Sequence, residues 1–214
     1  YHIPNRLEEG YGLSERGVLA ARSFGADLIV TVDSGITGHE EVEMAARLGL
    51  DVIVTDHHEP QDSLPEALAV VDPKRADSRY PYSDLAGVGV AYKLMEGLAK
   101  DELEVAYAVE ENLDLVAVGT VADIVPLRNE NRILTALGLA RLRGTGNPGL
   151  RALMEVAGVE PASAKASHIG FALGPRLNAA GRLGDASIGV ELLTTEDEEE
   201  AGRIARRLDR ENTK

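Results

Sequence analysis

Cysteine and tryptophan are both absent from this 214-residue sequence, and aromatic residues make up only 4% of it. The lack of cysteine excludes thiolate zinc sites, disulfides and cysteine nucleophiles. No apolar run approaches the length of a membrane-spanning helix, and the first residues lack the basic start, apolar run and cleavage site of a signal peptide. We therefore expect a cytoplasmic protein that does not enter a membrane.

Charge is unevenly spread along the sequence. The formal net charge is −14 at pH 7, which argues mildly against a protein that binds nucleic acid without help. Residues 141–182, however, carry six lysine and arginine side chains against Glu155 and Glu160, a local net charge of +4. The acidic run TTEDEEE that follows is typical of a solvated first helical turn, where acidic side chains suit the helix dipole.

Helical and strand patterns alternate in the first half of the chain. The sequence predicts helices over LSERGVLAARSFG and TGHEEVEMAARLG, and apolar strands over ADLIVTVDSG, LDVIVTDHH and ALAVVDP. Thr37 and Glu40 have the spacing of a capping box at the second helix. Apolar strands that alternate with helices indicate a parallel sheet with helices on both faces, and therefore the α/β fold class.

The remainder of the chain reads as a series of amphipathic helices. We expect an α/β domain over residues 1–140 and a smaller, mainly helical segment over residues 141–193. Residues 194–214 would begin a helix that connects to a further domain. Because the chain starts with Tyr1 and stops at Lys214 inside a charged helical pattern, we expect it to be a fragment of a longer protein.

Acidic and imidazole side chains stand where two of the predicted strands end. Asp33 follows LIVTV, and Asp56, His57 and His58 follow VIVT. The carboxyl ends of parallel strands open onto a shared crevice where ligands bind, and adjacent strands lie only about 5 Å apart. The chain turns at a strand end, so both histidines can reach this crevice. We expect the four side chains to converge.

The chemistry of these side chains favours a metal site. Carboxylate oxygen and imidazole nitrogen, without sulfur, form a ligand set for Mn²⁺, Mg²⁺ or Zn²⁺. A further acid, Asp123, lies in the otherwise apolar stretch GTVADIVPL, where a buried carboxylate needs a partner such as a cation. Taken singly, each strand-end acid has an alternative role as a helix cap or turn residue. Taken together, they predict a metal centre.

Five short motifs, in order along the chain, resemble a known family. TVDSG, TDHHEP and VGTVADIVPL are similar to successive motifs of the DHH phosphoesterase superfamily. IPNRLEEGYGL near the start and GFALGPRLNAAGRLGDA near the end are similar to the RecJ branch of that superfamily. The resemblance covers nearly the whole chain. It implies a single-strand-specific exonuclease that degrades DNA from the 5′ end with Mn²⁺ or Mg²⁺ as cofactor.

The resemblance implies a role for each residue of the strand-end cluster. Asp33 would bridge two metal ions, and His57 and Asp123 would complete the coordination of one of them. His58 would act as a catalytic residue close to the scissile phosphate. Asp56, the second catalytic candidate, would hold the histidine pair in orientation, which agrees with the need of a metal-bound imidazole for an anchor on its other nitrogen.

The two RecJ-like motifs supply candidates for substrate binding. Arg176, Asn178 and Arg182 in GPRLNAAGR match the part of the family that grips substrate phosphates, and guanidinium groups suit phosphate oxygens. The alternative for this stretch is an interdomain turn with surface arginines. Asn5 and Arg6 are candidates for a further phosphate contact, with loop structure as the alternative.

The implied reaction is hydrolysis of phosphodiester bonds in single-stranded DNA, in DNA repair and recombination. Two cations about 4 Å apart would share Asp33 and activate water for in-line attack. A helicase and a single-strand-binding protein are expected partners.

Two family motifs are missing from this sequence, namely the early Asp-x-Asp motif and the glycine-and-histidine motif of the DHH-associated domain. We therefore expect an incomplete metal site and an inactive fragment. Two alternatives stay open, a DHH phosphoesterase for small molecules or short oligonucleotides and a RecJ-related scaffold without catalysis.

Overall fold

The computed structural model describes residues 1–5, 8–182 and 186–214, and it divides the chain into two compact units, Tyr1–Asp101 and Glu102–Lys214. This division falls earlier than the boundary at 140/141 that the sequence suggested. The reason is that the helices at 113–122 and 129–142 share a hydrophobic core with the later helices and pack tightly on each other.

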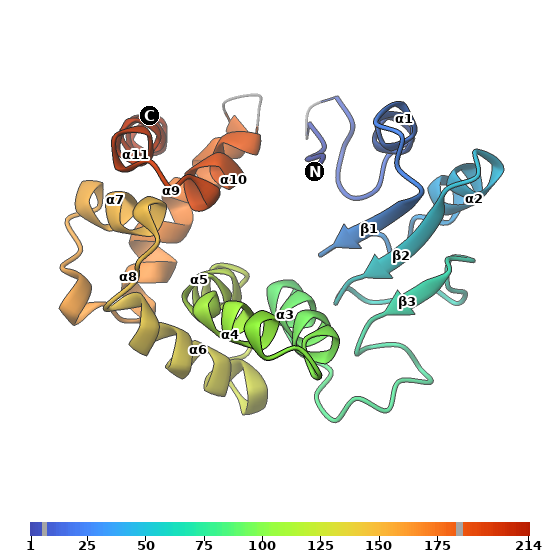
Figure 1. Cartoon of the computed structure of the whole chain (residues 1–214), viewed down its shortest axis with the longest axis horizontal. Helices are drawn as coiled ribbons and strands as arrows, with labels where there is room; N and C mark the ends of the chain where they lie inside the picture. Colours follow the sequence, from blue (N-terminus) through green and yellow to red (C-terminus); the bar gives the residue numbers. More distant parts are fainter. Residues whose placement is uncertain (6–7, 183–185) are drawn as a thin grey trace. The chain divides into compact units, whose positions relative to one another are not determined.

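The first unit is built on a parallel sheet. Its described strands are β1 (Leu28–Val32), β2 (Asp51–Thr55) and β3 (Ala69–Val71), which lie in the order β1-β2-β3 (Figure 1). Val32 pairs with Thr55, and Thr55 pairs with Val71, so the three strands end level with one another. The three predicted strands and their parallel arrangement are confirmed.

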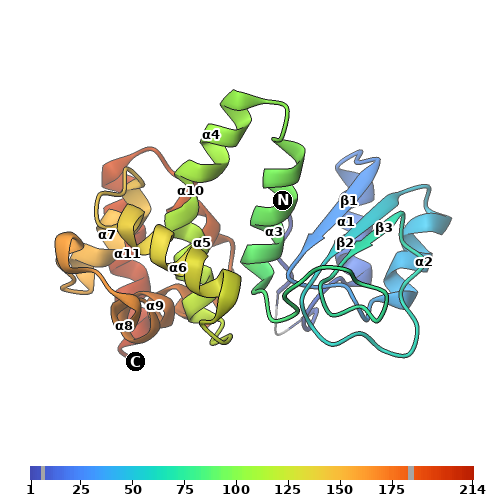
Figure 2. The same ribbon diagram turned by 90° about the horizontal axis from the view of Figure 1, so that it is seen from below.

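Helices cover both faces of this sheet, as the sequence predicted. On one face, α1 (Glu15–Ser23) and α2 (His39–Arg47) enclose a core with the central strand, and α3 (Gly87–Leu98) packs against the opposite face (Figure 2). The core on the first face consists of Val18, Val42, Ala45, Leu50, Val52 and Val54. The α/β fold class is therefore confirmed for this unit.

The N-termini of α1 and α2 differ in their capping. Ser14 caps α1, because its hydroxyl accepts a hydrogen bond of 3.0 Å from the backbone N–H of Gly17. The capping box predicted from Thr37 and Glu40 is wrong. The backbone makes a tight turn, in which Gly38 donates to the Gly35 carbonyl, and α2 begins after Gly38 without a side-chain cap.

The described part of the second unit is helical throughout. Its elements are α4 (Leu103–Glu111), α5 (Leu113–Ala122), α6 (Asn129–Leu142), α7 (Pro148–Val156), the 3-10 turn η1 (Pro161–Ser163), α8 (Ala166–His168), the π-helical turn η2 (Ile169–Leu173), α9 (Gly174–Asn178), the 3-10 turn η3 (Ala179–Arg182), α10 (Ser187–Thr194) and α11 (Glu198–Asn212). Their core is made of leucine, isoleucine, valine and alanine side chains from α5, α7, α10 and α11 in particular.

A glycine lets α5 and α6 pack closely on each other. A Cβ on Gly138 of α6 would lie 2.1 Å from the carbonyl oxygen of Leu113 in α5, so only glycine allows this approach.

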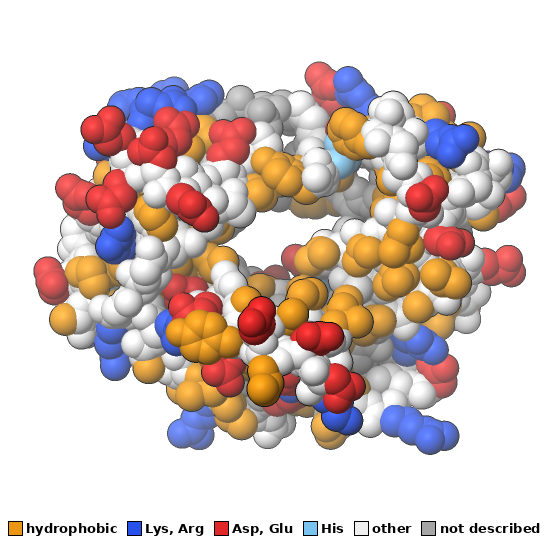
Figure 3. Space-filling model, viewed as in Figure 1, with side chains coloured by type: hydrophobic (Ala, Val, Ile, Leu, Met, Phe, Trp, Pro, Cys, Tyr) orange, Lys and Arg blue, Asp and Glu red, His pale blue; other side chains and the backbone are white. Residues whose placement is uncertain are grey.

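The last helix, α11, has Asp197 at its N-cap, with Glu198, Glu199 and Glu200 in the first turn, as the acidic run predicted. Acidic and basic side chains are interspersed on the surface over this helix (Figure 3).

Within the described ranges, no helix has both the length and the apolar character that crossing a bilayer demands.

Candidate metal centre

Three neighbouring strands of the sheet each end in an aspartate. Asp33 follows β1, Asp56 follows β2 and Asp72 follows β3, and the register of the strands places these residues side by side at the carboxyl edge. The predicted convergence of Asp33 with the Asp56-His57-His58 segment is present. Asp72 was not identified from the sequence, although it carries the same signal of an acid directly after an apolar strand.

Asp33 and the two histidines form a compact set of ligand atoms. Oδ1 of Asp33 lies 3.0 Å from Nε2 of His57. One ligand atom each from Asp33, His57 and His58 lie within 4.8 Å of one another, and no second group of this kind occurs among the residues that the structure describes. Two atoms that each lie about 2.2 Å from one ion are at most about 4.4 Å apart. Small side-chain rotations would therefore bring the three groups onto a common cation.

The burial of these groups suits a site that is anchored on one side and open on the other. The side chain of His57 is 8% exposed, whereas that of Asp33 is 51% exposed and that of His58 is 61% exposed. One carboxylate and two imidazoles without sulfur fit Mn²⁺, and they fit Mg²⁺ when further oxygen ligands join them. The residues present therefore fit a divalent cation.

The backbone holds Asp33 in an unusual conformation. Its φ angle is +61°, in the left-handed region that residues other than glycine rarely adopt, and such conformations cluster at functional sites. The first residue of α3 fixes the side chain in addition. A Cβ on Gly87 would lie 2.1 Å from Oδ1 and 2.8 Å from Cβ of Asp33. Only glycine therefore fits at position 87, and the helix packs directly on the candidate ligand.

Asp56 is the anchor of the histidine pair. Its Oδ1 accepts hydrogen bonds from the backbone N–H groups of His57 and His58, at 2.7 and 3.2 Å, and lies 2.6 Å from Nδ1 of His58. Its Oδ2 accepts a bond of 3.0 Å from the backbone N–H of Ile36, in the loop after β1. This contact pattern supports the orienting role that the family resemblance implied, and it leaves Nε2 of His58 open for a ligand.

The same contacts set the charge of Asp56. Burial, at 1% exposure, by itself raises the pKa of this carboxyl. The hydrogen bonds from Ile36, from the His58 ring and from the His57 and His58 backbone outweigh burial and hold the pKa below its ordinary value. Asp56 is therefore an anion at neutral pH, and its Oδ1 lies against Nδ1 of His58.

Asp72 has the opposite character. It is 5% exposed, and its pKa is raised, mainly by burial. A hydrogen bond from the Lys74 backbone N–H lowers this pKa, whereas the nearby charge of Asp56 raises it further. Two buried carboxylates at neighbouring strand ends are costly unless positive charge lies near them. The raised pKa of Asp72 reflects this cost, because burial disfavours its charged form.

Asp123 lies in the second unit, as the residue that ends α5. Ile124, which follows it, has a φ angle of +62°, a strained conformation for a β-branched residue. Strain beside Asp123 fits a functional position at the end of this helix. The expected joining of Asp123 with Asp33 and His57 stays a prediction.

The substrate-binding candidates have contrasting surroundings. Arg176 binds Asp209 through Nε at 2.9 Å and Nη2 at 2.8 Å, and its Nη1 donates to the carbonyl of Ala172. These contacts favour a structural role for its guanidinium, so its phosphate contact stays a prediction. Asn178 is exposed at the end of α9. The side chain of Arg182 lies outside the part of the chain that the structure describes.

Asn5 is held by Glu9, a residue of the motif IPNRLEEGYGL that was not among the candidates chosen from it. The backbone N–H of Asn5 donates to Glu9 at 2.9 Å, and the Ser14 hydroxyl donates to the same carboxylate at 2.7 Å. These bonds, with one from His2, lower the pKa of Glu9 to about 2. Glu9 thus ties the segment that carries Asn5 to the start of α1, whereas Arg6 lies outside the described residues.

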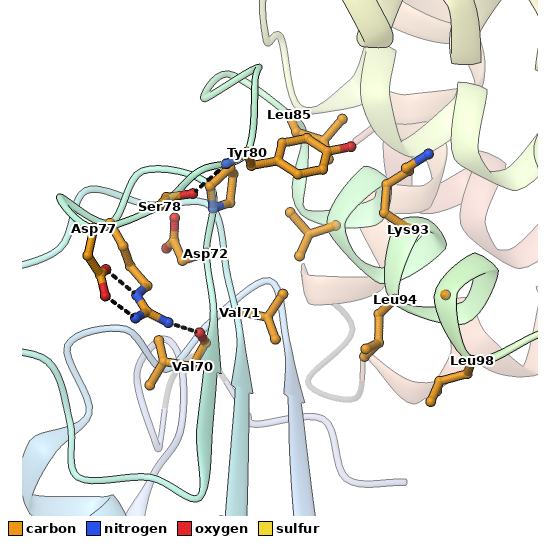
Figure 4. Close-up of a pocket in the computed structure, with 14 residues that line it drawn as sticks. Val70, Val71, Asp72, Asp77, Ser78, Tyr80, Leu85, Lys93, Leu94 and Leu98 are labelled. Carbon is orange, nitrogen blue, oxygen red and sulfur yellow. Dashed lines mark hydrogen bonds and ion pairs between the residues drawn. The ribbon is translucent and has the colours of Figure 1, made fainter. Parts of the chain in front are cut away.

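A separate pocket of about 490 Å³ lies beside the sheet edge, between the end of β3 and α3 (Figure 4). Val71 on the strand faces Leu94 on the helix across it, and most of its lining is apolar. Arg75 at its rim is neutralised by two bonds to Asp77, at 2.9 and 2.7 Å. Asp72 belongs to the lining, but Asp33, His57 and His58 do not, so the pocket is distinct from the candidate metal ligands.

The parallel α/β unit with carboxylate and imidazole side chains at its strand ends has the fold and the metal-binding chemistry that the resemblance to the DHH phosphoesterase superfamily implied. The chain belongs to the DHH family: the profile described as "DHH family, N-terminal domain" matches residues 1–120. The family resemblance found in the sequence is confirmed.

The particular relatives are RecJ proteins. The chain is 52% identical over 219 residues to the single-stranded-DNA-specific exonuclease RecJ of Escherichia coli (strain K12), a match that covers 98% of this chain and 38% of that protein. It is similar to a crystal structure of exonuclease RecJ bound to manganese, with a TM-score of 0.85, 38% identity, and coverage of 99% of this chain and 53% of that one.

RecJ from Thermus thermophilus in complex with Mg²⁺ is also similar, with a TM-score of 0.66, 34% identity, and coverage of 92% and 29% of the two chains. The chain thus spans well under half the length of the E. coli relative that it matches.

Proposed function

We propose that this chain is part of a RecJ-like exonuclease, which hydrolyses the phosphodiester bonds of single-stranded DNA from the 5′ end with Mn²⁺ or Mg²⁺, in DNA repair and recombination. The observation that carries the proposal is the cluster of Asp33, His57 and His58 at the strand ends of a DHH-family chain. The names of the RecJ relatives and the Mn²⁺ and Mg²⁺ in their structures support the substrate and the cofactor.

The residues of the cluster would have different roles in the reaction. Two divalent cations would supply an activated water and neutralise charge on the phosphodiester. Asp33 and His57 would hold these cations, with Asp123 as a further proposed ligand. Asp56 fixes the His58 ring so that its free Nε2 can approach the scissile phosphate.

The charge of the site explains why a cation is required. Asp33, Asp56 and Asp72 together place carboxylates at one edge of the sheet. Without bound cations this edge would repel a phosphodiester backbone, and with them it would attract one. The proposed activity is therefore strictly metal-dependent.

Metal binding is tested on the 214-residue chain by calorimetric titration with Mn²⁺. Asp33→Asn removes a proposed ligand, and Asp27→Asn is its matched control, because Asp27 lies just before the opposite end of β1 and is exposed. We expect Mn²⁺ binding to be lost in Asp33→Asn and kept in Asp27→Asn. Equal affinities of the two variants would show that the cluster is not the metal site.

The substrate is tested with the protein in its natural length and Mn²⁺. A long 5′-phosphorylated single strand, the same strand in a duplex, and a dinucleotide are offered in parallel. We expect release of nucleotides from the single strand alone. Preference for the dinucleotide would support the small-molecule alternative, and absence of hydrolysis together with capture of partner proteins would support the scaffold. Helicase and single-strand-binding partners, and a cytoplasmic location, stay predictions.

A further inference from the structure

Phe171 is an aromatic side chain on a distorted helical turn of the second unit. It lies in the π-helical turn η2 (Ile169–Leu173), and 86% of its surface is exposed. Ile169 and Leu173, at the two ends of this turn, are fully buried in the core of the unit. Single π-helical turns are rare and are often found at functional sites. The turn therefore presents Phe171 to the outside from a rigid base.

The turn also lies beside the end of α5. A Cβ on Gly170 would lie 3.7 Å from Cγ1 of Val121, and a Cβ on Gly174 would lie 3.3 Å from Cβ of Ala122. Gly174 thus lets α9 approach the last turn of α5 closely, and Gly170 of η2 lies in ordinary contact with the same turn, which ends at Asp123. Phe171 is consequently held close to the helix end that carries a proposed metal ligand.

We propose that Phe171 is a stacking residue for a nucleobase of the single-stranded substrate. This inference rests on the proposed function. A stacking contact does not depend on which base is bound, because every base has a π face. An unpaired base can turn its face towards an aromatic ring, whereas a base inside a duplex is already stacked between its neighbours. Phe171 would thus hold the strand near Asp123 and favour single strands over duplexes.

The surroundings of Phe171 favour a base over a protein partner. The ring of Phe171 is 86% exposed, and the residues on either side of it in the chain, Gly170 and Ala172, are small. Asn178, which is exposed in the same helical run, can donate a hydrogen bond to a phosphate or a base. A protein interface would instead need a broad apolar patch with packing around the ring.

The absence of tryptophan makes a direct test possible. Phe171→Trp introduces the only indole of the chain, and Phe24→Trp is its matched control, because Phe24 is 74% exposed at the end of α1 in the first unit. Each variant is titrated at low salt with a single-stranded oligonucleotide and with the corresponding duplex. We expect the single strand to quench the fluorescence of Phe171→Trp strongly, the duplex to quench it weakly, and Phe24→Trp to remain unquenched.

Binding affinities complete the test. Fluorescence anisotropy with a labelled single strand should show that Phe171→Ala weakens binding by roughly five- to a hundredfold, and that Phe171→Tyr, which keeps a ring, restores most of the affinity. Unchanged affinity of Phe171→Ala, in a chain that binds the strand, would overturn this inference alone. An indole at position 171 that is already shielded from solvent without DNA would overturn it in favour of a protein contact. No binding by the protein in its natural length would overturn the proposed function itself, and this inference with it.

Discussion

Replacing Gly87 by alanine would place a methyl group where the Asp33 side chain now lies. The new Cβ would be 2.1 Å from Oδ1, 2.4 Å from Cγ and 2.8 Å from Cβ of Asp33. Rotation of the carboxylate cannot relieve all three contacts, because the Cβ of Asp33 is itself too close. Asp33 would have to shift by about 1 Å to reach an ordinary van der Waals separation.

A shift of this size removes Asp33 from a coordination shell, since metal–ligand distances tolerate only about 0.2 Å. Disturbing even a residue that supports a metal ligand typically costs ten- to a hundredfold in affinity. We therefore expect Gly87→Ala to lower Mn²⁺ affinity by at least tenfold, which is about 1.4 kcal/mol. Folding stability should change by less than about 1 kcal/mol, because alanine favours the helix and Asp33 is half exposed.

Gly97→Ala is the matched control, because Gly97 lies in the same helix α3 and nothing lies within 4 Å of an added Cβ. Both variants are titrated with Mn²⁺ by calorimetry, and their folding is compared by circular dichroism. Gly97→Ala should bind Mn²⁺ as the unmodified chain does. If Gly87→Ala binds with the same affinity as Gly97→Ala, the contact between α3 and Asp33 does not control the metal centre.

Three further predictions concern the groups that hold the sites in place. Asp56→Asn replaces an acceptor of buried N–H groups by an amide, so it should lower the free energy of unfolding by about 1–3 kcal/mol in urea titrations; an unchanged midpoint would contradict the anchoring role. Glu9, whose pKa falls from an ordinary value of 4.5 to about 2 on folding, contributes stability that is complete above pH 4.5 and is lost as the pH falls towards 2. Glu9→Gln should remove this part of the loss of stability at acid pH. If the free energy of unfolding falls identically with pH in both proteins, the role of Glu9 is refuted. Arg176→Lys gives up the two-point contact with Asp209 and should destabilise the second unit by about 1 kcal/mol, whereas Asn178→Ala should leave its melting unchanged; equal melting of the two variants would point away from a structural role for Arg176.

Most elements of the first unit were predictable because local signals mark their ends. Ser14 and Gly25 bracket α1, and the apolar runs of β1 and β2 stop at acids. No comparable signal predicts α4 (Leu103–Glu111), because none of its residues is buried and no apolar stripe is needed. The π-helical turn was equally hidden, since it depends on the packing of Gly170 and Gly174 against α5, which sequence spacing cannot show.

The strand-end cluster was predictable because parallel strands in level register bring their last residues together. Asp72 was missed although it obeys the same rule. Its short strand was predicted, but only the acids that follow the first two strands were taken as candidates. Glu9 was missed although it lies in the motif IPNRLEEGYGL, because its importance lies in accepting a backbone N–H from Asn5, a contact that the motif does not show.

The single carboxylate of Asp56 joins two loops that are about 20 residues apart in the chain, since it accepts from Ile36 after β1 and from the histidine pair after β2. Neither loop can change its length independently of the other. An insertion or deletion between Val32 and Ile36 would displace the histidines even though it does not touch them, so these two connections should vary in length less than the connection between α2 and β2.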